Sequence, residues 1–162
     1  MVQKKPKQDL LHSLIDIITF DHADVVYILK NKKLVCDWLV SVIKKEGYLV
    51  GAINYTFCSD EYLLKINKKH LNHNTYTDII TFDLSENGII SSDIYISVER
   101  VRENAKYIKT AIKNEMLRVI VHGVLHLCGY KDKSPSESKI MRGKEDKYLL
   151  LLDKSRFHVK TL

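Results

Sequence analysis

Residues 122–132 read HGVLHLCGYKD and place two histidines four positions apart. Residues four apart on an α-helix lie on the same face, with their Cβ atoms about 5–6 Å apart. The imidazoles of His122 and His126 could therefore bind one metal ion, at the roughly 2.0–2.1 Å typical of Zn–N bonds. The alternative is core packing, in which each ring is hydrogen-bonded to a carbonyl or a carboxylate.

Two glycines in this stretch favour the metal hypothesis. Gly123 leaves space beside the first ring, and Gly129 can adopt the left-handed conformation that ends a helix. We therefore expect residues 130–133 to fold back over the histidine face and to bring Asp132 toward the same ion. Two imidazoles and one carboxylate leave a coordination position open for water, which is the arrangement of a catalytic zinc site.

The element that carries the histidines is predicted to be a buried helix over residues 111–128. Its formally charged residues stop at Arg118, and residues 119–129 contain none. A helix that is apolar all round is buried, so the second half should cross the middle of the domain. By spacing, Cys128 lies off the histidine face and belongs to the core.

The remaining elements are predicted from hydrophobic periodicity. Strands are expected at residues 12–20, 48–58, 77–84 and 89–98. Helices are expected at 32–46, at 98–108 and at 134–153. A further short helix, capped by Ser59 or Asp60, should contain Tyr62, Leu63 and Ile66. The four residues SENG between the last two strands predict an antiparallel pair. The fold class is therefore α+β: a single mixed β-sheet of about four strands with packed helices, and the metal site on the central buried helix.

Length and composition are those of an ordinary globular protein. The 162 residues fit one domain, 1–162, and the three cysteines show no CxxC spacing. No apolar run reaches 18 residues and no signal peptide is evident, so we expect a cytoplasmic protein without membrane contact. The net charge of +6 favours polyanionic partners, with a merely solvated surface as the alternative. Basic residues are concentrated in the middle third: Lys68, Lys69, Arg100, Arg102, Lys106, Lys109 and Lys113.

Three segments resemble one family. HGVLHLCGYKD is similar to the HGxLHLxGYDH motif of the YbeY family, bacterial zinc-dependent endoribonucleases of ribosomal RNA maturation and quality control. INKKHLNHNTYTDIITF at 66–82 resembles the family stretch that runs from Leu-Asn to Thr-Asp-Val-Leu-Ser-Phe, and SDIYISVERVRENA at 92–105 resembles its Gly-Asp-Ile-x-Ile-Ser segment. The resemblance implies one zinc ion bound by His122 and His126, with ribosomal RNA and the ribosome or its small subunit as partners.

The chain departs from the family pattern at two places. Lys131 and Asp132 replace Asp-His, so a carboxylate fills the third ligand position. Zinc accepts oxygen ligands at about 2.0–2.2 Å, but an anionic ligand lowers its effective charge. Leu71 replaces an arginine that the resemblance places at the scissile phosphate. The nearby candidates for that positive charge are Lys68, Lys69 and His73.

The predicted function is metal-dependent cleavage of RNA, with the ion held by His122, His126 and Asp132 and no general base assigned. Asp78 and Asp93 could orient a ligand histidine, although turn or cap roles are the alternative. Zinc peptidases also carry HxxxH on a helix, but they need the glutamate of HExxH where this chain has Gly123. A remaining alternative is a ribosome-associated RNA-binding assembly factor whose metal is mainly structural.

Overall fold

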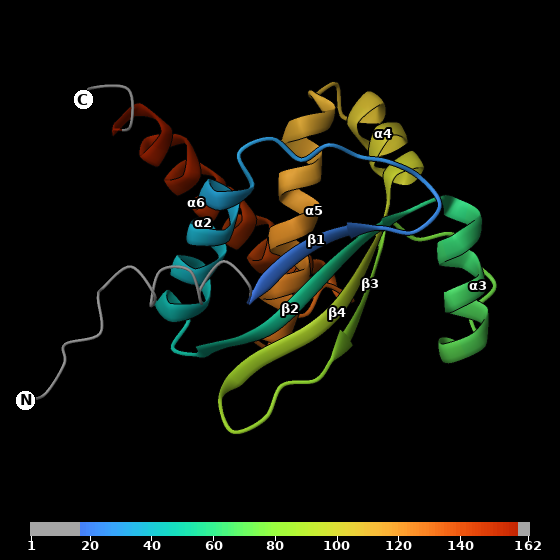
Figure 1. Cartoon of the computed structure of the whole chain (residues 1–162), viewed down its shortest axis with the longest axis horizontal. Helices are drawn as coiled ribbons and strands as arrows, with labels where there is room; N and C mark the ends of the chain where they lie inside the picture. Colours follow the sequence, from blue (N-terminus) through green and yellow to red (C-terminus); the bar gives the residue numbers. More distant parts are fainter. Residues whose placement is uncertain (1–16, 159–162) are drawn as a thin grey trace, which may run out of the picture.

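The computed structural model describes residues 17–158, with side chains through Asp153. In that part of the chain the strands form one sheet of order β1-β2-β4-β3 (Figure 1). The strands are β1 (Ile18–His22), β2 (Leu49–Cys58), β3 (Ile79–Asp83) and β4 (Ile89–Ser97). β1 and β4 each pair with β2 in parallel, and β3 pairs with β4 antiparallel. The predicted α+β class with one mixed sheet is confirmed.

The helices of the described residues follow the predicted order. They are α2 (Lys32–Lys45), α3 (Asp60–Leu71), α4 (Val98–Tyr107), α5 (Ile112–Leu127) and α6 (Pro135–His158). Ser59 caps α3 by accepting a hydrogen bond from the Tyr62 amide, and Ser97 caps α4 in the same way. None of these helices is both long and apolar enough to cross a membrane.

Several boundaries differ from the prediction, and α3, for example, continues past Ile66 to Leu71. The first strand was expected at 12–20, of which 12–16 lie outside the described residues, and the observed strand runs from Ile18 to His22. Pairing with β2 continues through the polar Asp21 and His22 because an edge strand tolerates exposed side chains. The β3–β4 connection also includes Leu84, because β3 ends at Asp83.

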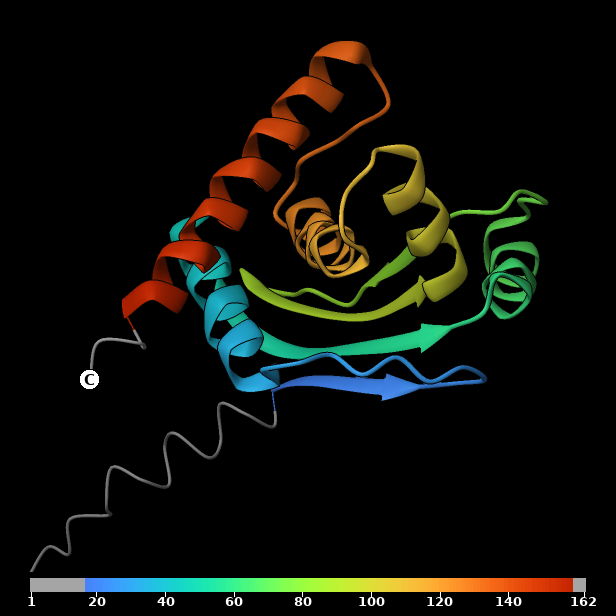
Figure 2. The same cartoon turned by 90° about the horizontal axis from the view of Figure 1, so that it is seen from above.

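The sheet has a hydrophobic core on each face. On β4, Ile94 and Ile96 point into the main core under α5, whereas Tyr95 between them points to the opposite face. On that opposite face α3 packs Leu63 against Ile80. Figure 2 shows α5 running across one face of the curved sheet, with α6 beyond it. The buried helix predicted from the uncharged run is therefore in place, and it holds the histidines beside β3.

Candidate metal site and its pocket

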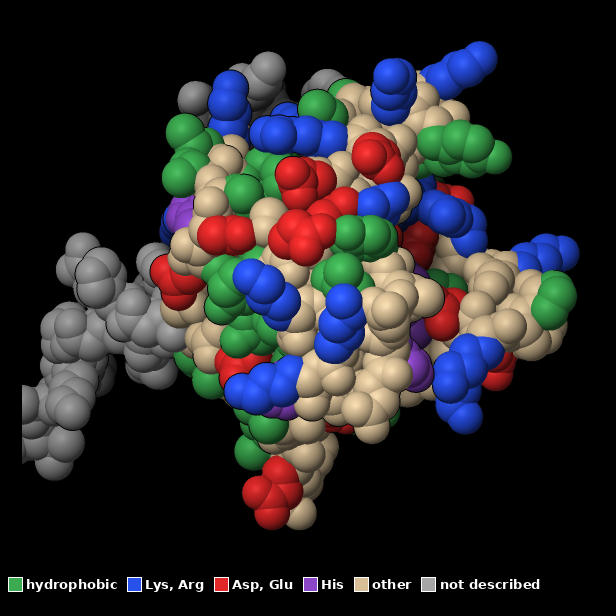
Figure 3. Space-filling model, turned by 90° about the vertical axis from the view of Figure 1, so that its right-hand side faces the viewer, with side chains coloured by type: hydrophobic (Ala, Val, Ile, Leu, Met, Phe, Trp, Pro, Cys, Tyr) green, Lys and Arg blue, Asp and Glu red, His purple; other side chains and the backbone are tan. Residues whose placement is uncertain are grey.

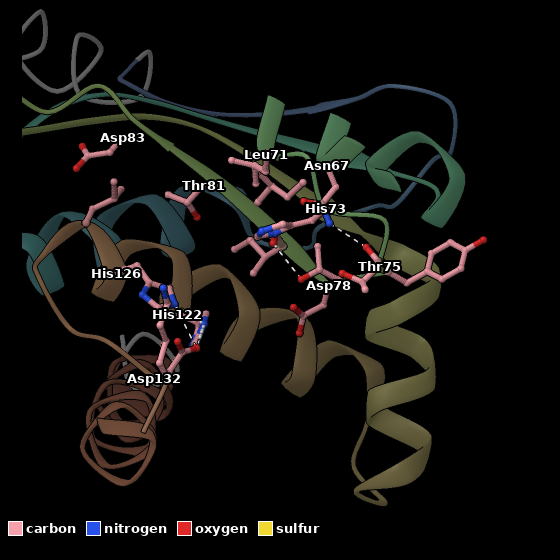
Figure 4. A pocket seen from close by; sticks show the side chains of 16 residues that line it. Asn67, Leu71, His73, Thr75, Asp78, Thr81, Asp83, His122, His126 and Asp132 are labelled. Carbon is pink, nitrogen blue, oxygen red and sulfur yellow. Dashed lines mark hydrogen bonds and ion pairs between the residues drawn. The ribbon is translucent and has the colours of Figure 1, made fainter. Parts of the chain in front are cut away.

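The last two turns of α5 bring the two imidazoles together. His122 Nε2 lies 2.9 Å from His126 Nε2. Gly129 follows the helix with a φ of 95°, and the chain then turns back over the histidine face. Asp132 Oδ2 lies 3.4 Å from each of the two Nε2 atoms. Figure 4 shows the three side chains converging at one end of a pocket.

The spacing of these three atoms fits a metal ion. Among the described residues, His122, His126 and Asp132 form a group of side chains that could hold a metal ion. Their ligand atoms lie within 4.8 Å of one another. A triangle with sides of 2.9, 3.4 and 3.4 Å has a circumradius of about 1.9 Å, just under the roughly 2.0–2.1 Å of Zn–N bonds. One ion can therefore contact all three atoms and keep an open side toward the pocket.

Each imidazole is oriented by a hydrogen bond from its other nitrogen. His122 Nδ1 donates to Glu145 Oε1 at 2.7 Å, and His126 Nδ1 donates to the Tyr130 carbonyl at 2.9 Å. With the protons on Nδ1, both Nε2 lone pairs face the space shared with Asp132. Ligand histidines in metal sites are held in this way, by a carboxylate or a carbonyl on the second nitrogen.

Glu145 is a site residue that the sequence analysis missed. It lies on α6, is only 4% exposed, and also binds Arg118 Nη1 at 2.8 Å and Arg142 Nη1 at 3.2 Å. Burial raises the pKa of the carboxyl, but the hydrogen bonds from His122 and Arg118 outweigh burial and the net pKa is lowered. Glu145 is therefore an anion that supports the ring of His122. Nothing in the local pattern KEDKY distinguishes it from a solvated glutamate.

The carboxylates around His122 favour a positive charge on or beside its imidazole ring. Burial lowers the pKa of the imidazole, but the hydrogen bond to Glu145 and the charges of Glu145, Asp78 and Asp132 raise it above its ordinary value of 6.5. Three carboxylates thus surround the ring of one histidine. The same negative potential attracts a metal cation, which binds the neutral imidazole in place of a proton.

A half-buried carboxylate, Glu46, fixes the segment that follows α5. Glu46, at the end of α2, accepts hydrogen bonds from the Tyr130 hydroxyl at 2.7 Å, from Lys144 Nζ at 2.9 Å and from the Tyr148 hydroxyl. Burial raises the pKa of Glu46, but the hydrogen bonds from these three donors outweigh burial. The net pKa is below its ordinary value of 4.5. The backbone of Tyr130, which accepts the proton of His126, is therefore tied to α2 and α6.

The metal group opens into a pocket of about 620 Å³. One wall is β3 and the segment before it, and the other is α5 with the returning segment (Figure 4). Its lining includes Asn67, Leu71, His73, Thr75, Tyr76, Thr77, Asp78, Ile79, Ile80, Thr81, Asp83, His122, His126, Leu127, Asp132 and Lys133. The face shown in Figure 3 has histidine side chains within a hollow beside the main body.

The structure separates the weaker sequence candidates. Asp78 and His73 line the pocket, whereas Lys68 and Lys69 are exposed on α3 and do not. Asp93 lies on the opposite face of the sheet from α5, where it accepts a hydrogen bond from Asn54 Nδ2 at 2.9 Å. Strand alternation decides this, because the neighbouring Ile94 points at α5.

Gly123 determines how closely β3 approaches the histidines. A Cβ at this position would lie 2.9 Å from Ile79 Cδ1 and 3.4 Å from Thr81 Oγ1. A glutamate there, as in HExxH peptidases, would require the Ile79 side chain on β3 to shift. The geometry thus supports the sequence argument against a peptidase.

The comparisons with known proteins agree on one family. The family model described as Endoribonuclease YbeY matches residues 18–153. The chain belongs to the YbeY family. Proteins named Endoribonuclease YbeY from Flavobacterium psychrophilum and Cytophaga hutchinsonii are each 48% identical to it, over 89% and 84% of this chain and 99% and 96% of theirs. A solution structure of TM1509 from Thermotoga maritima has a TM-score of 0.57 and 27% identity, covering 89% of this chain and 93% of that one.

Within the YbeY family pattern, the two departures of this chain lie on opposite walls of the pocket. Leu71, at the arginine position, lies at the end of α3, is 44% exposed and lines the pocket. Asp132 lies on the segment after α5, with its carboxylate at the imidazoles. No arginine is among the described residues that line the pocket, and its cationic side chains are Lys133 and, when protonated, its histidines.

Proposed function

We propose that this protein is a metal-dependent endoribonuclease that acts in ribosomal RNA maturation and ribosome quality control. The observation that carries the proposal is the convergence of His122 Nε2, His126 Nε2 and Asp132 Oδ2 at one end of an open pocket. The relatives that share nearly half of its residues are named endoribonucleases. We further propose ribosomal RNA within the ribosome or its small subunit as the substrate, and the cytoplasm as the compartment.

We propose one zinc ion as the cofactor. His122, His126 and Asp132 would hold the ion, and its side toward the pocket would stay open. Glu145 and the Tyr130 carbonyl would fix the orientation of the two imidazole rings. When bound, such an ion lowers the pKa of water and polarises a phosphoryl oxygen. Imidazole and carboxylate donors also accept other first-row metals, so the proposal of zinc depends on the family.

Asp78 is the carboxylate best suited to move a proton. It lines the pocket immediately before β3 and accepts a hydrogen bond from Asn104 Nδ2 at 3.2 Å. Burial raises the pKa of Asp78 above its ordinary value of 3.8, and the neighbouring His122 opposes part of this rise. A carboxylate with a raised pKa is a better proton acceptor for an attacking water. We therefore propose Asp78 as the general base.

The substrate phosphate would be contacted from two walls. His73 enters the pocket from the segment after α3, and Lys133 enters from the segment after α5. Positive charge on these groups would offset the charge that gathers on the phosphoryl oxygens in the transition state. They replace, less effectively, the bidentate contact that an arginine at position 71 would make.

The alternative function is an RNA-binding assembly factor with a mainly structural metal. The observation that favours it is the pocket itself, in which Leu71 presents an apolar side chain and the described lining contains no arginine. Both functions predict a bound metal and RNA affinity. Only the nuclease predicts cleavage that depends on the pocket.

Metal analysis of the purified protein tests the ligand set. The wild type should carry about one zinc per chain, and the double variant His122→Ala, His126→Ala should carry almost none. Equal metal content in both proteins would remove the proposed site. An Asp93→Asn variant is the control, because that carboxylate lies on the other face of the sheet and should leave the metal in place.

A nuclease assay on ribosomal RNA tests the catalytic claim. Wild type should cut the RNA, whereas His126→Ala and Asp78→Asn should lower the rate by 100-fold or more. Asp93→Asn, on the opposite face of the sheet from the pocket, is the matched control and should keep most of the activity. Equal cleavage by wild type and His126→Ala would indicate a contaminating nuclease. Binding without any cleavage would establish the assembly factor instead.

A further inference from the structure

The connection between α4 and α5 carries a positive surface that the pocket does not use. Residues 104–114 read NAKYIKTAIKN, with three lysines and no acidic residue. We name this stretch the α4–α5 corner. Lys106, Lys109 and Lys113 are all exposed and make no ion pair among the described residues. Figure 3 shows Lys and Arg side chains gathered at the upper end of the molecule, where α4 and α5 meet in Figure 1.

The acidic residues that flank the corner in sequence are paired with arginines. Glu103 binds Arg100 Nη1 at 2.8 Å, and Glu115 is buried with its carboxylate 3.7 Å from Arg118 Nε. The two carboxylates that flank the corner in sequence are thus already paired with arginines. The three lysines of the corner are therefore not paired with either of these carboxylates.

Apolar surface is exposed among the lysines. Tyr107 is 88% exposed, Ile108 47% and Ile112 42%. A purely solvated charged surface needs no exposed aromatic ring, whereas lysines on both sides of a free ring suit a nucleic acid. The lysines neutralise phosphates and the ring stacks on a base. A shallow hollow of about 530 Å³, lined by Glu103, Asn104, Lys106 and Tyr107, lies beside the ring.

The backbone of the corner is fixed. Ile108 N donates to Asn104 O at 3.0 Å, Thr110 N donates to Ala105 O at 2.9 Å, and Lys109 takes a left-handed conformation with a φ of 56°. This hydrogen-bonded end of α4 presents the lysines and the ring from a defined turn. Little backbone entropy is then lost when a ligand binds.

We propose that the α4–α5 corner is a second RNA-binding surface, which holds the substrate RNA at a distance from the cleavage pocket. Lys113 and His122 are nine residues apart on α5, or about 14 Å along the helix axis. Asn104 also bonds to Asp78 of the pocket, so the corner and the pocket share a wall. A polynucleotide can span both, whereas a mononucleotide cannot. This inference rests on the proposed function for the identity of the ligand.

Binding of a fluorescein-labelled, single-stranded oligouridylate of twenty nucleotides, measured by anisotropy with EDTA present, tests the corner apart from catalysis. The triple variant Lys106→Gln, Lys109→Gln, Lys113→Gln should bind at least ten-fold more weakly than wild type. The slope of log K against log salt should fall by about 2, since each lost contact to a single strand removes about 0.7. Tyr107→Ala should lose at least about five-fold through stacking.

The matched control is Lys30→Gln, Lys44→Gln, Lys45→Gln, which removes the same charge from exposed lysines elsewhere. It should change the affinity less than three-fold. An equal loss in both triple variants, or no loss in the corner variant, would overturn the proposal. Preferential, corner-dependent binding to vesicles of equimolar phosphatidylserine and phosphatidylcholine, with RNA affinity unchanged, would overturn it in favour of a membrane.

The two proposals fail separately. If wild type cuts RNA but the corner variant binds normally, the corner is not a binding surface and the nuclease stands. If wild type never cuts but its binding depends on the corner, the nuclease fails and the corner stands.

Discussion

Glu145 Oε1 lies 2.7 Å from His122 Nδ1, although the two residues are 23 positions apart on different helices. The same carboxylate is held by Arg118 at 2.8 Å. α6 thus delivers a buried anion to the back of a candidate metal ligand. The fit of the site depends on how two long helices pack, as well as on the HxxxH spacing within α5.

Replacing Glu145 tests this support. Glu145→Gln keeps an oxygen that can accept the Nδ1 proton but loses the charge, and we expect zinc affinity to fall about 10- to 100-fold. The measurement is competition with a chromophoric chelator. Asp146→Asn is the matched control, because Asp146 binds the same Arg118, at 3.0 Å, without contacting His122. A loss of affinity as large in the control would assign the effect to the arginine.

The Tyr130 hydroxyl positions the segment that carries Asp132. Tyr130→Phe removes its 2.7 Å hydrogen bond to Glu46 but leaves the carbonyl that accepts the His126 proton. We expect the free energy of unfolding to fall by about 1 kcal/mol, and zinc to dissociate several-fold faster.

Tyr148→Phe separates these two effects. The Tyr148 hydroxyl also donates to Glu46, but it lies on α6 and outside the segment after α5. We expect a comparable loss of stability in urea unfolding, with the rate of zinc release unchanged. Faster release in Tyr148→Phe as well would mean that the hydroxyl of Tyr130 has no particular role at the metal.

The pH dependence of folding reports on Glu46. Its pKa is below the ordinary value of 4.5 in the folded protein, so its contribution to stability is complete above about pH 4.5 and is lost as the pH falls through the folded pKa. Glu46→Gln should therefore flatten the acid side of the stability curve. Urea unfolding between about pH 3 and 6 measures this. Glu86→Gln is the control, an exposed carboxylate without an ion pair among the described residues, and a curve of unchanged shape for Glu46→Gln would contradict the assignment.

Local sequence patterns predicted the helices and strands. They also predicted that His122, His126 and Asp132 would lie close together. Apolar periodicity located the helices, and the uncharged run after Arg118 located the buried half of α5. Gly129 indicated the turn that returns Asp132, because only a left-handed residue allows that reversal. These signals lie within one or two turns of the residues they position.

Contacts between distant segments could not be predicted in this way. Glu145 and Glu46 lie in polar stretches, KEDKY and KKEGY, that are typical of solvated surface. Only the packing of α2, α5 and α6 buries Glu145 and surrounds Glu46 with donors. Asp93 was a candidate because of its residue type, yet its position on β4 points its side chain to the face of the sheet opposite the metal group. A shift of one residue along a strand moves a side chain to the opposite side of the sheet.

Leu71 offers a test of what the pocket lacks. It is 44% exposed and lines the pocket, so an arginine there requires no repacking of the core and can extend toward a phosphate. Leu71→Arg should raise RNA affinity and the cleavage rate about ten-fold, because a guanidinium donates two parallel hydrogen bonds to a phosphate. Leu71→Met, which keeps size and neutrality, is the control and should match wild type. If Leu71→Arg binds more tightly but cuts no faster, the pocket of this chain places the phosphate beyond the reach of position 71, and His73 and Lys133 become the groups to mutate next.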